Sequence, residues 1–375
     1  MNNYKQIIES KFDYSSNYYD SVASVQKTVA DTLVSKLLMV NPLTNEKKEN
    51  FLLKYTKNII SKCVSKFSNQ EFFNQKDIRK RVILDLGTGT GYVPETLSKS
   101  HPDAIYILND ISGKMLDICK KKFVNNIDNN FQFLHCDMFN LINQSVELLE
   151  KKEIINSSNK IYSNIINNKY SNSNTINTNS NSNTINTNSN SNTINTSQII
   201  IDNNNQYPVN KITVDYCDVI TSSLSFQWVE NLYQIIENCH EISNNFAFAT
   251  LLENTFMKWY NLIKEYDHNI ILPNYPNVFD LIKFCFRISK FNLNQDKNHN
   301  NSRFYYWVMD FPVYFNDLQS FIEYLNKLSG CAVPNEKFYH KKSISYNNLK
   351  EFMKAEKNKP IKLYYKVFFG IFTKE

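Results

Sequence analysis

The sequence predicts an α/β fold whose mostly parallel sheet binds a ligand at the carboxyl ends of its strands. A β-branched, apolar run, 81–84, leads into a glycine-rich turn, 85–91, and helix-compatible residues follow it. Further apolar strands then recur with helices between them, and the acids Asp110 and Asp137 come where two of these strands end. A strand, a glycine turn and a helix in this order are typical of sites where helix N–H groups face a ligand.

The glycine turn has the spacing D-x-G-x-G-x-G, from Asp85 to Gly91. Its third glycine comes one residue earlier than in the dinucleotide pattern G-x-G-x-x-G, and an acid lies inside the motif. This spacing resembles the S-adenosylmethionine (AdoMet) site of class I methyltransferases. The alternative is an ordinary tight turn in an α/β protein that binds no nucleotide.

Helical stretches precede the first strand. Residues 1–38 carry apolar side chains three to four positions apart, which predicts helix, and 43–70 is a lysine-rich stretch with a helix from 46 to about 66. We therefore expect residues 1–75 to form an N-terminal helical cap with an inserted helix.

The second and third strands each lead to an acid. The strand 104–108 ends at Asp110, where a carboxylate can accept both ribose hydroxyls of a nucleoside. Ser112 is expected to cap the next helix. The strand 131–136 runs into Asp137, which is placed to accept a hydrogen bond from an adenine amino group. His135 is expected to pack rather than to catalyse.

An Asn/Ser-rich segment then interrupts the pattern. A nonapeptide starting at Thr175 repeats from Thr184 and begins again at Thr193. Its apolar content is too low to bury a core, so we expect 141–212 to be a disordered insertion.

The fold resumes after this insertion. Strand 216–220 is followed by the turn 221–223, at the sheet edge where open α/β sheets bind ligands. The further elements expected are a helix at 231–241, a strand at 245–250, helices at 253–267 and 275–286, an aromatic strand at 305–311, a helix at 317–328 and closing strands at 363–372. Residues 76–140 and 213–375 then form one domain, with a lid or substrate part at about 253–330.

The seven cysteines are scattered and include no C-x-x-C pair, which argues against a disulfide framework or a zinc site and suits a reducing compartment. No apolar run is long enough to span a membrane, and the amino terminus has no basic-then-apolar signal pattern. Glu9 and Asp13 also disfavour a transit peptide. We expect a cytoplasmic protein with no metal, nucleic acid or membrane partner.

The net charge of +6 comes entirely from the carboxy-terminal third, because residues 251–375 hold 18 Lys and Arg against 12 Asp and Glu. One explanation is a solvated, lysine-rich surface. The other is a face that attracts an acidic partner.

Five segments match patterns of a single family. They are 12–20 (FDYSSNYYD), 222–232 (SSLSFQWVENL), 248–259 (FATLLENTFMKW), 325–335 (LNKLSGCAVPN) and 365–375 (YKVFFGIFTKE). Together they resemble the malonyl-acyl-carrier-protein O-methyltransferases of biotin synthesis. In two places asparagine stands where that family has glycine, at Asn254 and at Asn244–Asn245, and asparagine tolerates left-handed backbone angles.

The resemblance implies a Rossmann-like class I methyltransferase fold, with a seven-stranded, mostly parallel sheet, helices on both faces, N-terminal helices and a helical lid insertion. It also implies AdoMet as methyl donor. The residues expected to bind it are Asp85, Gly87, Thr88, Gly89, Gly91, Asp110, Ile111, Met115, Asp137, Met138 and Ser223.

The implied reaction is methyl esterification of the free carboxylate of a malonyl thioester on acyl carrier protein. Such a carboxylate is ionised at neutral pH and needs no general base. Tyr19 and Trp228 resemble residues that close over the methyl group. A cationic side chain is expected to anchor the carboxylate, with Arg303 preferred over Arg287 and Lys258.

The acidic carrier protein would dock on the basic carboxy-terminal third of a monomer. The candidate contacts are Lys337, Lys341, Lys342, Lys354 and Lys357.

Two alternatives remain open at the level of sequence. One is a methyltransferase acting on another small carboxylic acid, such as trans-aconitate. The other is a methyltransferase-like assembly factor of a respiratory complex, which would bind AdoMet and carry a mitochondrial targeting segment.

Overall fold

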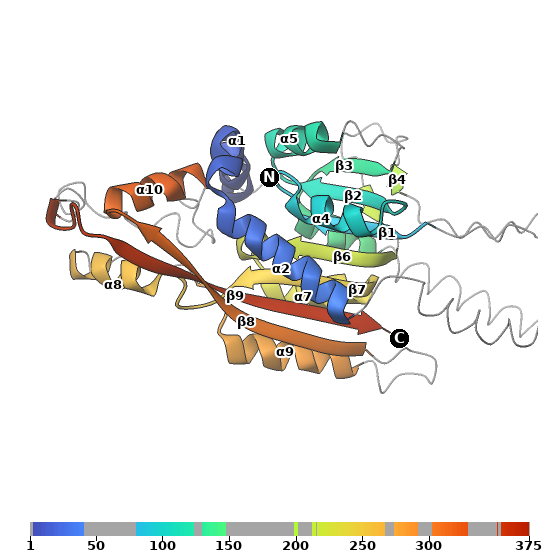
Figure 1. Ribbon diagram of the computed structural model, residues 1–375. Coiled ribbons are helices and arrows are strands. Elements are labelled where there is room, and N and C mark those ends of the chain that lie inside the picture. Colours follow the sequence, from blue (N-terminus) through green and yellow to red (C-terminus); the bar gives the residue numbers. More distant parts are fainter. Residues whose placement is uncertain are drawn as a thin grey trace, which may run out of the picture.

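The computed structural model describes residues 3–40, 80–123, 130–147, 199–201, 212–214, 216–266, 274–291, 302–328, 351 and 354–374. Within these ranges seven strands form one sheet in the order β3-β2-β1-β6-β7-β9-β8, with helices packed around it (Figure 1). The first five strands of this order run parallel, and β9 pairs antiparallel with both β7 and β8. The expected Rossmann-like α/β fold is confirmed.

The sheet strands are β1 Val82–Leu86, β2 Ile105–Asp110, β3 Phe131–His135, β6 Cys217–Ser223, β7 Ser243–Leu251, β8 Ser302–Phe315 and β9 Ile361–Lys374. The helices are α1 Asn3–Val22, α2 Ser24–Val40, α4 Tyr92–Ser100, α5 Gly113–Phe123, α7 Leu232–Glu241, α8 Met257–Tyr266, α9 Val278–Phe291 and α10 Leu318–Lys327. The aromatic strand is longer than expected, because β8 pairs with β9 along its full length, from Ser302 opposite Lys374 to Phe315 opposite Ile361.

Two apolar layers hold the helices against the sheet. Successive residues of β1 point to opposite faces, so that Ile83 joins the layer under α2, α4 and α5, whereas Leu84 joins the layer under α7 and α9. All five residues of β1 are buried. A strand covered on both faces needs a continuous apolar run, which explains why 82–84 reads as Val-Ile-Leu.

The segment 141–212 departs from the expectation that it lacks structure. Residues 141–147 continue a helix that starts at 138, and Leu141 and Ile142 are buried in the second apolar layer. Further on, β4 Ile199–Ile201 pairs antiparallel with β5 Ile212–Val214. Short apolar runs at the two ends of the segment supply these elements, and the overall Asn/Ser composition obscured them. The nonapeptide repeats and the expected helix at 46–66 lie outside the described residues.

Asn254 takes a φ of 68°, as expected for an asparagine that replaces a glycine. Asn244 and Asn245 instead belong to β7, and neither has a positive φ. Asn245 Nδ2 donates to the Asp218 carbonyl at 3.1 Å. At this position the asparagines bind neighbouring strands rather than form a left-handed turn.

One glycine makes the packing of β7 on β9 possible. Gly370 lies opposite Phe248, and a Cβ on Gly370 would stand 2.5 Å from Phe248 Cε1. We predict that Gly370→Ala lowers the free energy of unfolding by about 1–3 kcal/mol, because the Phe248 ring is enclosed and has no room to move. Urea denaturation measures the loss. In a Phe248→Leu background the same substitution should cost clearly less, and an equal cost would contradict the explanation.

Candidate functional site

The carboxyl ends of β1, β2 and β6 meet at one edge of the sheet and line a cavity of about 720 Å³, its open mouth included. Nine of the eleven residues expected to bind AdoMet line the cavity: Asp85, Gly87, Thr88, Gly89, Asp110, Ile111, Met115, Met138 and Ser223. Tyr19 and Trp228 line it as well.

Asp85 at the end of β1 is a buried carboxyl group, with 2% of its surface exposed. Thr221 Oγ1 of β6 donates a hydrogen bond to Asp85 Oδ1 at 2.7 Å. Burial raises the pKa of Asp85 to about 7, although this hydrogen bond acts in the opposite direction. The side chain therefore titrates near neutral pH and responds to any positive charge that enters the cavity.

Asp110 at the end of β2 has both carboxylate oxygens engaged by the backbone. Gly89 N–H donates to Oδ2 at 2.7 Å and Ser112 N–H donates to Oδ1 at 2.8 Å. Burial is the main cause that raises the pKa of Asp110 to about 6. Each oxygen keeps a lone pair for a further donor, so the carboxylate can still accept two hydroxyls.

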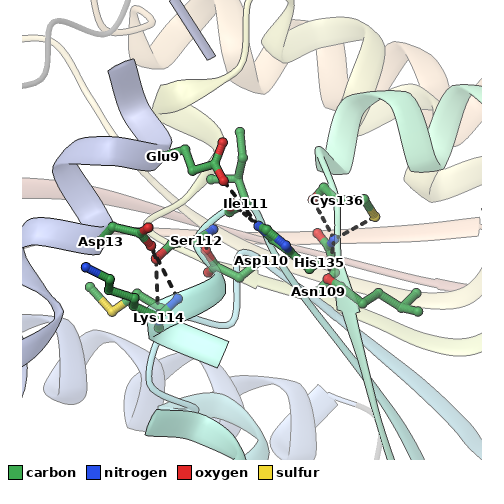
Figure 2. A network of polar contacts seen from close by, with 11 residues as sticks. Glu9, Asp13, Asn109, Asp110, Ile111, Ser112, Lys114, His135 and Cys136 are labelled. Carbon is green, nitrogen blue, oxygen red and sulfur yellow. Dashed lines mark hydrogen bonds and ion pairs between the residues drawn. The ribbon is translucent and has the colours of Figure 1, made fainter. Parts of the chain in front are cut away.

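The neighbouring contacts fix the edge of the sheet (Figure 2). Asn109 Nδ2 donates to the carbonyls of Leu134 and Cys136 at 3.2 and 2.8 Å, which ties the end of β2 to the end of β3. Ser112 Oγ accepts from Met115 N–H at 3.2 Å and thus caps α5 as expected. His135 is half exposed rather than packed, and its Nε2 lies 2.9 Å from the Ile111 carbonyl.

The glycines of the turn have two different tasks. Gly89 has a φ of 55°, and a Cβ built on it would meet no atom within 4 Å, although the residue lines the cavity. Gly91 has a φ of 92° and does not line the cavity. A Cβ on Gly91 would stand 2.7 Å from Cys119 Sγ, so this glycine allows α4 to approach α5.

Asp137 is also absent from the cavity wall. Its Oδ1 lies 3.0 Å from Lys5 Nζ of α1 and accepts from Asn140 N–H at 2.9 Å. The carboxylate expected to meet an adenine is thus engaged by the N-terminal helix and by the start of the helix at 138–147.

Helix α1 covers the cavity through polar contacts with three different loops. Asp13 Oδ1 accepts from Ser112 Oγ at 2.6 Å, as Figure 2 shows. Asp20 accepts from Thr90 Oγ1 and Tyr92 Oη at 2.5 and 2.9 Å and pairs with Lys122 at 3.1 Å. Burial alone would raise the pKa of Asp20, but these three partners hold it below its usual value.

A second cavity adjoins the first. The two share five wall residues, Phe12, Tyr19, Gln26, Leu224 and Trp228. The second also has an aromatic lining, supplied by Phe256, Trp259, Tyr260, Tyr275 and Tyr365. Of these ten residues the sequence indicated Tyr19 and Trp228 as part of a site, and no sequence signal marked Gln26, Tyr260 or Tyr275.

Two wall residues have unusual backbone angles. Leu224 has a φ of 51° and Phe256 a φ of 57°, both in the left-handed region that apolar L-residues rarely adopt. Strained residues of this kind cluster at ligand sites. Leu224 also stands between the two cavities, so its backbone angle helps to shape their junction.

The structure does not bring Arg303 to this site, which corrects its expected role as carboxylate anchor. Arg303 on β8 lies opposite Thr373, and Thr373 lies opposite Asn245 at the amino end of β7. That end of the parallel sheet is the edge opposite to the cavities. Arg287 and Lys258 are exposed and line neither cavity.

Residues 83–149 match the family model described as "Methyltransferase domain". The matched segment contains the glycine turn and the acids at the ends of β1, β2 and β3, which stand on the seven-stranded sheet described above. The match covers less than a fifth of the chain and marks this segment as similar to a methyltransferase domain. The methyl donor of such a domain is AdoMet.

Two curated relatives of this chain are named malonyl-[acyl-carrier protein] O-methyltransferase. The protein from Priestia megaterium is 28% identical over 118 residues, which are 32% of this chain and 30% of that protein. The protein from Halalkalibacterium halodurans is 28% identical over 140 residues, 37% and 39% of the two chains. The matched part of this chain thus spans about a third of the length of each relative.

Solved structures align more widely at lower identity. The YcgJ protein of Bacillus subtilis is 9% identical, with 80% of this chain and 94% of that protein covered and a TM-score of 0.40. The plantazolicin methyltransferase BpumL is 12% identical, with 99% and 98% covered and a TM-score of 0.38. Within the described residues, no helix combines the length and the apolar character needed to cross a bilayer.

The pKa of Asp85 leads to a prediction about AdoMet binding in the first cavity. AdoMet carries positive charge, which favours the carboxylate, so binding below about pH 7 should release a proton. The affinity should therefore rise from pH 5.5 to about 7 and level off above that. Calorimetric titration in buffers of different ionisation enthalpy measures both quantities. Asp85→Asn should weaken binding and flatten the profile near neutral pH, whereas Asp103→Asn, at an exposed carboxyl, should change neither.

The two glycines give a second prediction. Gly89→Ala should weaken AdoMet binding at least about tenfold, because its methyl group enters the cavity, with only about 1 kcal/mol lost in stability from the left-handed angle. Gly91→Ala should chiefly destabilise the fold, because its methyl group strikes Cys119. AdoMet titration and urea denaturation of both variants separate the effects, and equal losses of affinity would contradict the division of tasks.

Proposed function

We propose that the protein transfers the methyl group of AdoMet to the free carboxylate of a malonyl group held on acyl carrier protein. The observation that carries the proposal is the pair of adjoining cavities. One has buried acids and a glycine turn that suit AdoMet, and the other has an aromatic wall that suits an acceptor. Because they share Tyr19, Leu224 and Trp228, a donor in one and an acceptor in the other meet at that junction.

The first cavity fits AdoMet by the chemistry of its wall. Asp110 keeps free lone pairs for the two ribose hydroxyls, and Asp85 supplies a carboxyl group that positive charge would ionise. The open space at Gly89 lets the backbone approach the ligand. When bound, AdoMet supplies a methyl group activated by a sulfonium. We propose that Ile111, Met115, Met138 and Ser223 complete the wall around it.

The second cavity would orient the acceptor. A carboxylate is ionised at neutral pH, so one of its oxygens attacks the methyl carbon while the bond from carbon to sulfur breaks. The carboxylate becomes an ester and no proton moves. The chain's contribution is alignment and exclusion of water by the rings of Tyr19, Trp228 and Phe12, whose ring stands edge-on to Trp228 at 5.5 Å.

The acceptor's identity is supported by the names of the two curated relatives. The basic carboxy-terminal third fits an acidic carrier protein, and Lys354 and Lys357 are exposed there. Lys337, Lys341 and Lys342 lie outside the described residues. A cytoplasmic location, where malonyl thioesters would be at hand, is part of the proposal.

Transfer of label from methyl-labelled AdoMet tests the proposal. Malonyl-acyl carrier protein, malonyl-coenzyme A, free malonate and trans-aconitate are offered in parallel, and label should pass chiefly to the carrier-linked malonyl group. Asp85→Asn should lose most of this activity, whereas Asp103→Asn should keep it. Label on trans-aconitate or free malonate alone would favour an enzyme of small free acids. AdoMet binding with no label on any acid would overturn the proposal and favour an assembly factor.

A further inference from the structure

Four tyrosines from four separate elements line the second cavity. Tyr19 comes from α1, Tyr260 from α8, Tyr275 from the segment before α9 and Tyr365 from β9. Tyr260 and Tyr275 line the same cavity, and their side chains lie within range of electrostatic interaction with one another. Phenols gathered from such distant parts of the chain supply several O–H donors to one cavity.

These hydroxyls differ in what they already bind. Tyr365 Oη lies 2.8 Å from Tyr324 Oη, and Gln26 also bonds to Tyr365. Tyr260 and Tyr275 have no hydrogen-bond partner among the described residues, and neither hydroxyl is sealed off by protein. Both residues line the cavity, so their side chains border the space that an acceptor would occupy.

Both phenols remain protonated. Burial raises the pKa of Tyr260 and of Tyr275 far above the ordinary value for tyrosine. A phenol that stays neutral is a permanent O–H donor, and O–H donors form short, strong hydrogen bonds with carboxylates. The two side chains thus suit an anion without adding a charge of their own.

We propose that Tyr260 and Tyr275 hold the carboxylate of the acceptor as neutral hydrogen-bond donors, and that the positive charge which balances this carboxylate belongs to AdoMet. This inference rests on the proposed function and names the anchor in place of Arg303. A carboxylate is costly to bury in an aromatic cavity unless a cation stands nearby. The first cavity shares a wall with the second and would supply that cation with the methyl donor.

The arrangement suits the chemistry, because an anion and a sulfonium react to give a neutral ester and a neutral thioether. A fixed arginine on the carboxylate would bind the acceptor tightly before reaction and make its oxygen less nucleophilic. Phenols orient the carboxylate with less loss of reactivity. The acceptor should then bind well only after the donor has brought its charge.

Binding measurements test the inference without turnover. Malonyl-acyl carrier protein is titrated into protein saturated with sinefungin, which has an ammonium in place of the sulfonium, or with S-adenosylhomocysteine, a neutral thioether. Affinity should be about tenfold or more higher with sinefungin. Acetyl-acyl carrier protein, which has no carboxylate, should bind equally to both complexes.

Tyrosine variants identify the anchor. Tyr260→Phe and Tyr275→Phe should each weaken malonyl-acyl carrier protein binding to the sinefungin complex about five- to tenfold and leave acetyl-acyl carrier protein unaffected. Tyr314→Phe, at a phenol that is 67% exposed on β8, is the matched control and should change neither.

Equal affinity of malonyl-acyl carrier protein for the two complexes, an equal gain for acetyl-acyl carrier protein, or unchanged binding by both tyrosine variants would overturn the inference. If malonyl-acyl carrier protein binds neither complex, the proposed function fails. The inference about the two tyrosines is then tested separately by titrating free malonate into the same two complexes. The inference is supported if malonate binds only in the presence of sinefungin and binds the Tyr275→Phe variant less well. Malonate that binds neither complex, or both equally, would overturn it.

Discussion

Charged side chains on one side of helix α1 hold it over the carboxyl edge of the sheet, and both cavities depend on the position of this helix. Lys5 pairs with Asp137 after β3, Asp13 binds the start of α5 after β2, and Asp20 binds the turn after β1. At 3.6 residues per turn the three side chains lie within about a quarter turn of one another around the helix axis, so one side of α1 makes all the contacts. Phe12 and Tyr19, from the same helix, then form part of the wall of each cavity.

The two buried acids lower the stability of the fold at this edge of the sheet. Asp85 and Asp110 lie in a low-dielectric environment, and burial disfavours their charged forms. A sequence selected for stability alone would place neutral side chains there. The donors from Thr221, Gly89 and Ser112 offset part of the cost and fix both carboxyl groups in position. A cationic ligand in the cavity would offset the remainder of this cost. Part of the free energy of ligand binding would then come from the improved environment of these two poorly solvated carboxyl groups.

Local sequence predicted the strands and the acids at their ends because each strand-turn-helix unit carries its signal within a few residues. Asp85 and Asp110 lie on the cavity wall for this reason. The expected role of Arg303 was wrong because it depends on strand direction: β8 runs antiparallel to β9, and its first residues come to the amino end of β7. Tyr260 and Tyr275 gave no signal, since only the tertiary fold brings α8 and the segment before α9 to one cavity.

Because β8 pairs with β9 over a long stretch, part of the second cavity is built by residues that lie beyond the parallel strands of the first cavity. Strand β7 pairs with residues 367–373 of β9, so the stretch 361–366 and its partners on β8 continue as a two-stranded ribbon beside α10 (Figure 1). The second cavity, but not the first, is lined by Tyr365 of this ribbon and by Leu325 and Leu328 at the end of α10. Mutations there can remodel the second cavity while the parallel strands keep the first cavity unchanged. In evolutionary terms, and on the proposed assignment of donor and acceptor, one cofactor site can therefore serve a succession of substrates.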